Sequence, residues 1–398
     1  MASFCSDFDC IVIGAGIIGC SSAYQLAKKG CKTLLLEQFR LPHTRGSSHG
    51  QSRILRYAHP EPIMVDMVRE SFQMWQQLEK EAETKIFRQT GMLLIDSESP
   101  PQESNEWDKV FANCDIPHEY LTSKELCARY RGIEFHGNYK VTLEKMAGVL
   151  AAGKALVCYQ NLLLKHGGKI LDGEKVLDII PKRKVTVKTM QGTYVAKSLI
   201  LTPGPWASQL LHPLGLKLPL TVERINTCYW HEKVQGTFLK FPVFADVTVR
   251  DPVNAERDTV VYGLPSDEYP GLMKVCLHQG TTIADADSRD RPENGNMEDI
   301  DILSRYIRHH FPGLDDLPHI VEPCLYTNTP DHVPIIDQHP VFPNIVFACG
   351  MSGAGFKFAP VYGKILTQLI FGEHVDYDLS AFRYNRFNEP GGGTMSKL

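Results

Sequence analysis

Residues 9–37 read DCIVIGAGIIGCSSAYQLAKKGCKTLLLE, a stretch with an apolar run, three spaced glycines and a second apolar run that ends in an acid. The run 10–13 is typical of a buried parallel strand, and the apolar residues after the glycines fall at helical spacing. Between them, Gly14, Gly16 and Gly19 form G-x-G-x-x-G. The first glycine permits a tight turn, the second lets backbone N–H groups approach a pyrophosphate, and the third lets the helix pack close to the strand. The stretch therefore predicts a nucleotide-binding strand–turn–helix unit.

A second strand, KTLLLE (32–37), ends in Glu37, whose carboxylate is placed to accept hydrogen bonds from ribose hydroxyls. A glycine-rich turn with a solvated glutamate could imitate part of this pattern. Strand, glycines, helix, strand and terminal acid in one short unit favour the dinucleotide site instead. The acid also favours an unphosphorylated ribose, so FAD or NAD over NADP.

The next segment, LPHTRGSSHGQSRILRYAH (41–59), departs from a plain NAD domain because it carries Arg45, Arg53 and Arg56 among hydroxyls and glycines. Forked guanidinium donors and backbone N–H groups suit a phosphate or a carboxylate. An exposed basic loop has the same composition, and the residues alone leave both interpretations open.

The rest of the chain alternates between helical and strand patterns. Residues 61–83 predict an amphipathic helix whose apolar side is core, and residues 147–167 predict another helix. Residues 184–206 predict two strands, 216–320 has an antiparallel character, and 344–370 reads as strand, glycine turn and helix. The predicted core residues of the first helix are Met64, Met67, Val68, Phe72, Trp75 and Leu78.

These patterns predict an α/β fold of the two-domain α+β kind. We expect a Rossmann-like domain that binds FAD or NAD, assembled from residues 1–85, 145–215 and 321–386. A mixed or antiparallel-sheet substrate domain takes 86–144 and 216–320, and a flexible tail takes 387–398.

Composition narrows the function classes. The chain has 398 residues, a formal charge of −4 and no basic excess that would indicate nucleic acid or an anionic membrane. Its 11 cysteines are odd in number and form no C-x-x-C, which argues against a disulfide framework and a zinc site. No apolar run approaches the length of a membrane span. The chain ends in Ser396-Lys397-Leu398, which reads as a peroxisomal import-receptor signal.

Several motifs occur in the order typical of one family. They are the N-terminal unit ending in Glu37, PHTRGSSHGQSRILR, YGLP…GLMKVCLH, CLYTNTPD and GMSGAGFKFAPVYGK. Together they resemble the sarcosine oxidase/L-pipecolate oxidase family over almost the whole chain. The resemblance implies a monomer with FAD, and a fold shared with D-amino-acid and glycine oxidases. It also implies oxidation of a small secondary amino acid, L-pipecolate, sarcosine or L-proline, by O2, giving an imine and H2O2.

The resemblance assigns a role to Cys324. In this family a cysteine followed by x-Tyr-Thr carries the flavin through a thioether to the 8α-methyl carbon, and Cys324-Leu325-Tyr326-Thr327 matches that motif. A thiolate must form before it can attack, so a neighbouring cation should lower its pKa. The family position of that cation matches Arg53. A buried inert thiol is the alternative.

The same resemblance implies the substrate site. Arg56 and Lys357 match the pair that binds the substrate carboxylate, and Tyr262 and His278 match positions that line the pocket. Lys274 matches the lysine held near flavin N5, where a cation stabilises negative charge as oxygen is reduced. We therefore expect catalytic roles for Lys274, Arg53, His278 and Tyr262.

The resemblance also implies a larger set of FAD contacts. Besides Cys324, they are Gly14, Gly16, Ile17, Ile18, Gly19, Glu37, Gln38, Arg45, Ser47, Ser48, Ser52, Arg53, Val176, Gly204, Trp206, Gly353, Gly355, Phe356 and Lys357. The chain departs from the family at Ala354, where histidine is frequent. Alanine is neutral if that histidine makes a backbone contact to the flavin, and substrate preference differs if the histidine ring shapes the pocket.

Three rival functions share parts of this pattern. A fructosyl- or other N-alkyl-amino-acid oxidase would share the cysteine and the glycine loops but need a roomier pocket. A dehydrogenase would pass its electrons to another protein and react poorly with oxygen. The presence of Lys274 argues against a dehydrogenase. A non-catalytic flavin-binding protein would not need the cations at Arg53, Arg56, Lys274 and Lys357.

Overall fold

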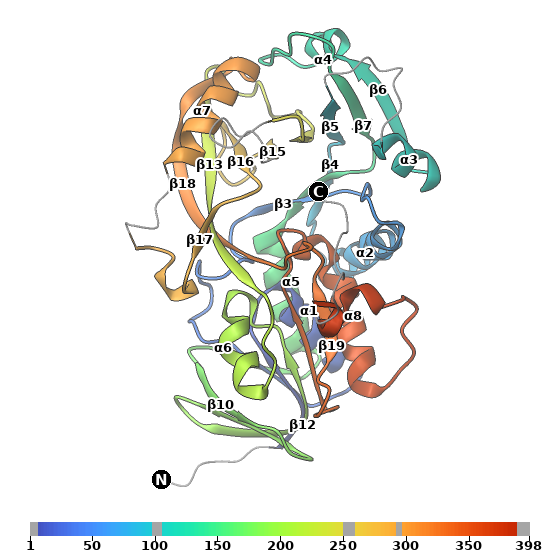
Figure 1. Cartoon of the computed structure of the whole chain (residues 1–398), viewed down its shortest axis with the longest axis vertical. Helices are drawn as coiled ribbons and strands as arrows, with labels where there is room; N and C mark the ends of the chain where they lie inside the picture. Colours follow the sequence, from blue (N-terminus) through green and yellow to red (C-terminus); the bar gives the residue numbers. More distant parts are fainter. Residues whose placement is uncertain (1–6, 98–105, 250–258, 292–296, 388–398) are drawn as a thin grey trace.

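The computed structural model describes residues 7–97, 106–249, 259–291 and 297–387 (Figure 1). In this part of the chain, two large sheets and one three-stranded sheet form the framework. The unit that carries α1, α5 and α8 fills the lower half of Figure 1, and β5–β7 with β13–β16 fill the upper half. No helix in the described ranges has the length and apolar character needed to cross a membrane. The predicted tail 387–398, with its terminal Ser-Lys-Leu, lies outside the described residues apart from Phe387.

The elements have the following bounds. The first sheet contains β1 (Asp7–Ile13), β2 (Thr33–Leu36), β9 (Lys169–Leu171), β10 (Val176–Ile180), β11 (Val185–Thr189), β12 (Thr193–Leu201), β19 (Ile335–Gln338) and β20 (Ile345–Cys349). The second sheet contains β5 (Met92–Ser97), β6 (His118–Thr122), β7 (Lys140–Glu144), β13 (Thr221–Glu232), β14 (Val243–Asp246), β15 (Val261–Pro265), β16 (Leu272–Leu277), β17 (Thr281–Ile283) and β18 (Leu314–Asn328). The small sheet contains β3 (Ser52–Leu55), β4 (Phe87–Gln89) and β8 (Gly148–Ala151). The α-helices are α1 (Ile17–Lys28), α2 (Pro62–Glu81), α3 (Glu106–Asn113), α4 (Ser123–Arg129), α5 (Ala152–Lys165), α6 (Ala207–Leu211), α7 (Glu298–His310) and α8 (Gly355–Phe371).

The first sheet has a parallel core. Strand β1 pairs in parallel with β2 on one side and β12 on the other, and β12 also pairs in parallel with β20. Alternate residues of β1 are buried on opposite faces: Cys10 and Val12 belong to the cluster that packs α1, α2, α5 and α8, and Ile11 and Ile13 to the cluster that packs α6. A parallel sheet covered on both faces requires consecutive apolar residues, as at positions 10–13 of β1. Together with the mixed second sheet, this arrangement confirms the predicted fold class.

Strand β18 is a 15-residue strand of the second sheet. Strand β18 pairs antiparallel with β13 from Thr221↔Asn328 to Glu232↔Leu314. The strand therefore runs without interruption through residue 321, where the sequence interpretation divides the two domains. Cys324, near the C-terminal end of β18, lines the cavity described below.

The predicted elements differ from the structure at one helix start. Residues 147–167 were expected to be helical throughout, but Gly148–Ala151 forms β8, and α5 begins at Ala152. Strand β8 pairs with both β3 and β4. A Cβ atom at Gly148 would lie 2.1 Å from the carbonyl oxygen of Arg88, so only glycine allows this approach. Pairing on both sides outweighs the helical pattern of the sequence. The helix expected over 61–83 is α2, and all six of its predicted core residues are buried.

Helix α8 packs against α1 at a glycine. A Cβ atom at Gly363 would lie 2.4 Å from Ser21 Oγ and 2.9 Å from the backbone nitrogen of Ser22. Gly363→Ala should therefore lower the free energy of unfolding by about 1–3 kcal/mol, although alanine is the better helix former. A double-mutant cycle with Ser21→Gly, measured by chemical unfolding, should give a favourable coupling of about 1 kcal/mol or more, because that change removes the nearest atom. A Gly363→Ala protein as stable as the wild type would contradict this account.

Candidate active site

A cavity of about 610 Å³ lies between the first sheet and the second. Its walls come from the β1–α1 turn, the segment 41–56, the start of α8, and one face of the second sheet. Of the predicted site residues, all but Gly19 and Arg45 line it. One cavity thus collects residues that are widely separated in the sequence.

The nucleotide end of the cavity is built by the glycine turn. Gly14 has a φ of +99°, and a Cβ atom there would lie 2.4 Å from the carbonyl oxygen of Thr202. Gly16 is the N-cap of α1 and offers no capping side chain, while the N–H of Ile17 donates to Ser48 Oγ at 3.0 Å. The helix start therefore presents backbone and hydroxyl groups to the cavity, where its dipole favours an anion such as a diphosphate.

Glu37 closes this end at the tip of β2. It is 6% exposed, and its carboxylate accepts the N–H of Ala15 at 2.8 Å and that of Phe39 at 3.0 Å. These bonds fix the carboxylate beside the glycine turn. Gln38, Val176, Gly204 and Trp206 line the same end. A carboxylate held in this way can accept hydrogen bonds from ribose hydroxyls, so the residues present fit the adenosine diphosphate half of FAD.

Two predicted contacts are placed elsewhere. Gly19 lies against the strand, where a Cβ atom would come within 1.9 Å of the carbonyl oxygen of Gly14. It therefore serves the close helix–strand packing. Arg45 forms an ion pair with Asp290, and its guanidinium lies 5.8 Å from the centre of the Phe39 ring. The arginine is engaged outside the cavity wall.

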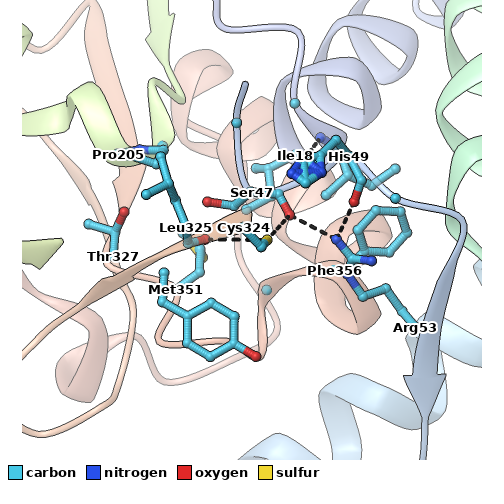
Figure 2. Close-up of a pocket in the computed structure, with 18 of the residues that line it drawn as sticks. Ile18, Ser47, His49, Arg53, Pro205, Cys324, Leu325, Thr327, Met351 and Phe356 are labelled. Atoms are coloured by element: carbon cyan, nitrogen blue, oxygen red, sulfur yellow. Dashed lines mark hydrogen bonds between the residues drawn. The ribbon is translucent and has the colours of Figure 1, made fainter. Parts of the chain in front are cut away.

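Arg53 and Cys324 meet at the carbonyl oxygen of Ser47 (Figure 2). The Arg53 guanidinium donates to this oxygen at 2.9 Å and to the carbonyl of His49 at 2.6 Å, and it lies 5.3 Å from the centre of the Phe356 ring. Cys324 Sγ lies 4.0 Å from the same Ser47 oxygen. A cation is therefore held close to the thiol by backbone carbonyls that do not neutralise it.

Cys349 is a second cysteine in the cavity wall and provides a contrast. It is 1% exposed, and burial raises the pKa of its thiol to about 12. A thiol with such a pKa is inert at neutral pH. Cys324 differs because its Sγ contacts the Ser47 carbonyl oxygen to which Arg53 also donates.

The second sheet contributes a face of alternating residues. In β16 and just beyond it, Lys274, Cys276 and His278 point the same way because strand side chains alternate. Lys274 lies opposite Tyr229 of β13 and Leu264 of β15. Its ammonium is 3.4 Å from the carbonyl oxygen of Ser52 and 5.8 Å from the centre of the Tyr229 ring. Burial, followed by the charge of Arg53, lowers the pKa of Lys274.

The far end of the cavity holds two more cations. Arg56 follows β3, and Lys357 lies in the first turn of α8, where its own carbonyl accepts Trp75 Nε1–H at 3.1 Å. Burial, and next the charge of Arg56, holds the pKa of Lys357 well below its usual range. Burial also lowers the pKa of Arg56, which the carboxylate of Glu144 opposes. Two half-buried cations on the same cavity wall suit a small carboxylate.

An aromatic group stands beside these cations. Tyr326 Oη lies 3.3 Å from His278 Nδ1, and the Tyr262 and His278 rings meet edge to face at 5.9 Å. Burial, with the charges of Lys357 and Arg56, lowers the pKa of His278 to about 3, so its ring is neutral at physiological pH. A Cβ atom at Gly353 would lie 2.5 Å from His278 Cε1, so the glycine lets the α8 loop approach this group.

Sequence reasoning missed several lining residues. Tyr229 and Glu322 face the cavity because of the β13–β16 and β13–β18 registers, which a single sequence does not reveal. The alternation along residues 221–230 was the only available signal for Tyr229. Trp107 lies in α3, a helix that the sequence analysis did not predict. The guanidinium carbon of Arg56 is 5.7 Å from the centre of the Trp107 ring.

Solved structures support the fold. NikD, an amino acid oxidase essential for nikkomycin biosynthesis, superimposes in its open form with a TM-score of 0.83 at 22% identity, over 95% of this chain and 98% of that chain. L-Proline dehydrogenase from P. horikoshii gives a TM-score of 0.79 at 19% identity, over 97% of this chain and 99% of that chain. At these identities the similarity concerns the fold alone.

Sequence similarity identifies the family as well as the fold. Residues 9–369 match the family of FAD dependent oxidoreductases. The peroxisomal sarcosine oxidase of Mus musculus is 47% identical over 398 residues, covering 100% of this chain and 99% of the relative. The monomeric sarcosine oxidase of Bacillus sp. (strain NS-129) is 34% identical over 383 residues, covering 95% and 97%. This chain therefore belongs to the sarcosine oxidase family of FAD-dependent oxidoreductases.

Proposed function

We propose that this protein is an FAD-dependent oxidase of a small secondary amino acid, with L-pipecolate and sarcosine as the first substrates to test and L-proline as a third. The observation that carries the proposal is one cavity with a dinucleotide cradle at one end and the Arg56–Lys357 pair at the other. The products are the imine and H2O2. When bound, FAD accepts the hydride equivalent from the substrate and passes the electrons to O2.

The substrate is held by its carboxylate in this proposal. Arg56 offers a forked guanidinium and Lys357 a point charge, and both are depressed in pKa because they are buried together. A bound carboxylate stabilises both charged forms. His278 stays neutral beside them and adds no further positive charge, which suits a substrate amine that must be deprotonated before it is oxidised.

Lys274 and Cys324 serve the cofactor side. Lys274 places a buried cation on the sheet face, where it would stabilise the negative charge that develops as O2 is reduced. Cys324 would hold FAD through a thioether, and the nearby Arg53 would favour the thiolate that must form first. A tethered cofactor cannot dissociate between turnovers.

The proposed location is the peroxisome. The terminal Ser396-Lys397-Leu398 matches a peroxisomal import-receptor signal. The relatives at 46–47% identity are named peroxisomal sarcosine oxidases. Production of H2O2 gives such a location a chemical reason. We expect the protein to act as a monomer.

The rival functions fit less well. A fructosyl-amino-acid oxidase must accommodate several sugar hydroxyls, but the wall beside Arg56 is apolar, with Met92, Ala245 and Leu264 among its residues. Buried polar groups without partners cost about 1–3 kcal/mol each. A flavin-binding protein without activity would have no anionic ligand to offset the burial of Arg56 and Lys357.

The cofactor linkage can be tested with a matched cysteine pair. Acid precipitation of the yellow wild-type protein and of Cys349→Ser should leave the colour in the pellet, whereas Cys324→Ser should release it to the supernatant. Both cysteines line the cavity, but only Cys324 contacts the Arg53 loop. Release of the colour from the wild type as well would rule out the thioether.

Two lysines should affect different half-reactions. Lys357→Met should raise KM for the amino acid about 10- to 100-fold by removing a charge-assisted contact, with a smaller effect on reoxidation. Lys274→Met should slow reoxidation of the reduced flavin by O2 about 100- to 1,000-fold and leave reduction by substrate nearly intact. Stopped-flow absorbance measures the two steps separately. The assignment fails if both variants impair the same step.

The lowered pKa of Lys357 predicts a pH dependence of carboxylate binding. The charged lysine binds acetate below its pKa, so the affinity should fall as pH rises through a value well below the ordinary 10.5. Flavin absorbance changes during acetate titrations at pH 6–10 report the dissociation constant. In Lys357→Met this pH dependence should disappear, whereas His278→Asn should keep it because His278, with a pKa of about 3, is neutral throughout that range.

A further inference from the structure

One wall at the substrate end belongs to a single hydrophobic cluster. The second sheet contributes Met92 from β5, Ala245 from β14 and Leu264 from β15, and Val247 and Val260 lie beside those strands. All of these residues line the cavity that Arg56 and Lys357 enter. A ligand held by its carboxylate at the two cations would therefore meet apolar side chains on this side.

Trp107 is the aromatic member of this wall. It lies in the first turn of α3, is half-buried, packs against the same cluster and lines the cavity. The Arg56 guanidinium carbon is 5.7 Å from the centre of its ring. A ring face at this distance attracts a cation without cancelling its charge. One side chain thus touches both the carboxylate-binding arginine and the apolar space beside it.

We propose that Trp107 is a specificity-determining residue that selects secondary amino acids with an apolar ring next to the amine over those with only a methyl group. This inference rests on the proposed function. The indole ring orients Arg56 through its face and gives a substrate ring a surface to pack on. Sarcosine has no ring, so it benefits only from the orientation of Arg56. L-Pipecolate benefits from that orientation and also from the packing surface.

Three substitutions separate the two contributions. Trp107→Ala removes both the ring face and the wall, Trp107→Leu keeps an apolar wall without a π face, and Trp107→Phe keeps both in smaller form. The matched control is Phe111→Leu. Phe111 lies on the same helix and in the same cluster, is 1% exposed, and contacts the His118 ring at 4.9 Å. It tests whether disturbing the packing of α3 is sufficient.

Binding is measured first, on the flavin-containing protein, with two carboxylates that cannot react. Acetate reports on Arg56, and cyclohexanecarboxylate reports on Arg56 and the wall together. In Trp107→Ala, the dissociation constant for acetate should rise about 2- to 5-fold and that for cyclohexanecarboxylate about 10-fold more. Trp107→Leu should recover most of the additional loss in cyclohexanecarboxylate binding, because it keeps an apolar wall. It should recover little of the loss in acetate binding, because it has no π face. Trp107→Phe should stay within about 3-fold of wild type for both.

Turnover supplies the second readout. The ratio of kcat/KM for L-pipecolate to that for sarcosine should fall about 10-fold in Trp107→Ala and remain unchanged in Phe111→Leu. An unchanged ratio in Trp107→Ala, with both substrates still bleaching the flavin, overturns the inference and leaves the proposed function intact. An equal fall in Phe111→Leu also overturns it, because the effect would then come from helix packing. If neither substrate bleaches the wild-type flavin, the proposed function fails and the inference fails with it.

Discussion

Buried positive charge is the constraint on which the rest of this site depends. Besides Lys175, four cations line one cavity, and water is a far better solvent for an ammonium or guanidinium group than a protein interior. They are Arg53, Arg56, Lys274 and Lys357. The contacts that hold them are largely backbone carbonyls and ring faces, which stabilise a cation and leave its charge uncancelled. The cavity therefore keeps a positive electrostatic potential, which favours the binding of anions.

The buried carboxylate of Glu144 opposes part of this positive charge. Glu144 accepts the N–H groups of Tyr57 at 2.6 Å and Ala58 at 3.1 Å, so it is bound to the backbone that follows Arg56. Burial raises its pKa, and those hydrogen bonds and the cations oppose the rise. The charge of Arg56 is opposed by Glu144 and, more weakly, by Glu61, whereas Glu144 alone is a carboxylate partner of Lys357 among the interactions that shift its pKa.

Local patterns in the sequence predict the glycine turn and the acid that line the nucleotide end of the cavity. The turn at Gly14 and the acid at Glu37 belong to one continuous unit whose periodicity and spacing are visible in a single chain. The substrate half depends on strand register, which brings Tyr229 opposite Lys274 and cannot be read from one sequence. The start of α5 was misjudged for a related reason, because Gly148–Ala151 is held as a strand by two partners distant in the chain. The family motifs predict Lys274 and Lys357 as site residues, which periodicity does not. No motif includes Trp107, so its place in the cavity wall was not predicted.

The two structural units divide the chemistry between them. Lys274 and Cys324 stand on the second sheet, in β16 and β18, whereas Arg53, Arg56 and Lys357 come from β3, the residue after it and α8. The two sets meet where Cys324 Sγ and the Arg53 guanidinium share the carbonyl of Ser47. In the proposed function, a cofactor bonded at that point would lie at the contact of the two units, with the oxygen-side cation supplied by one and the carboxylate-binding cations by the other. The wall beside Arg56 also comes from the second unit, so the proposed selection of substrate shape and the proposed binding of the carboxylate depend on different elements.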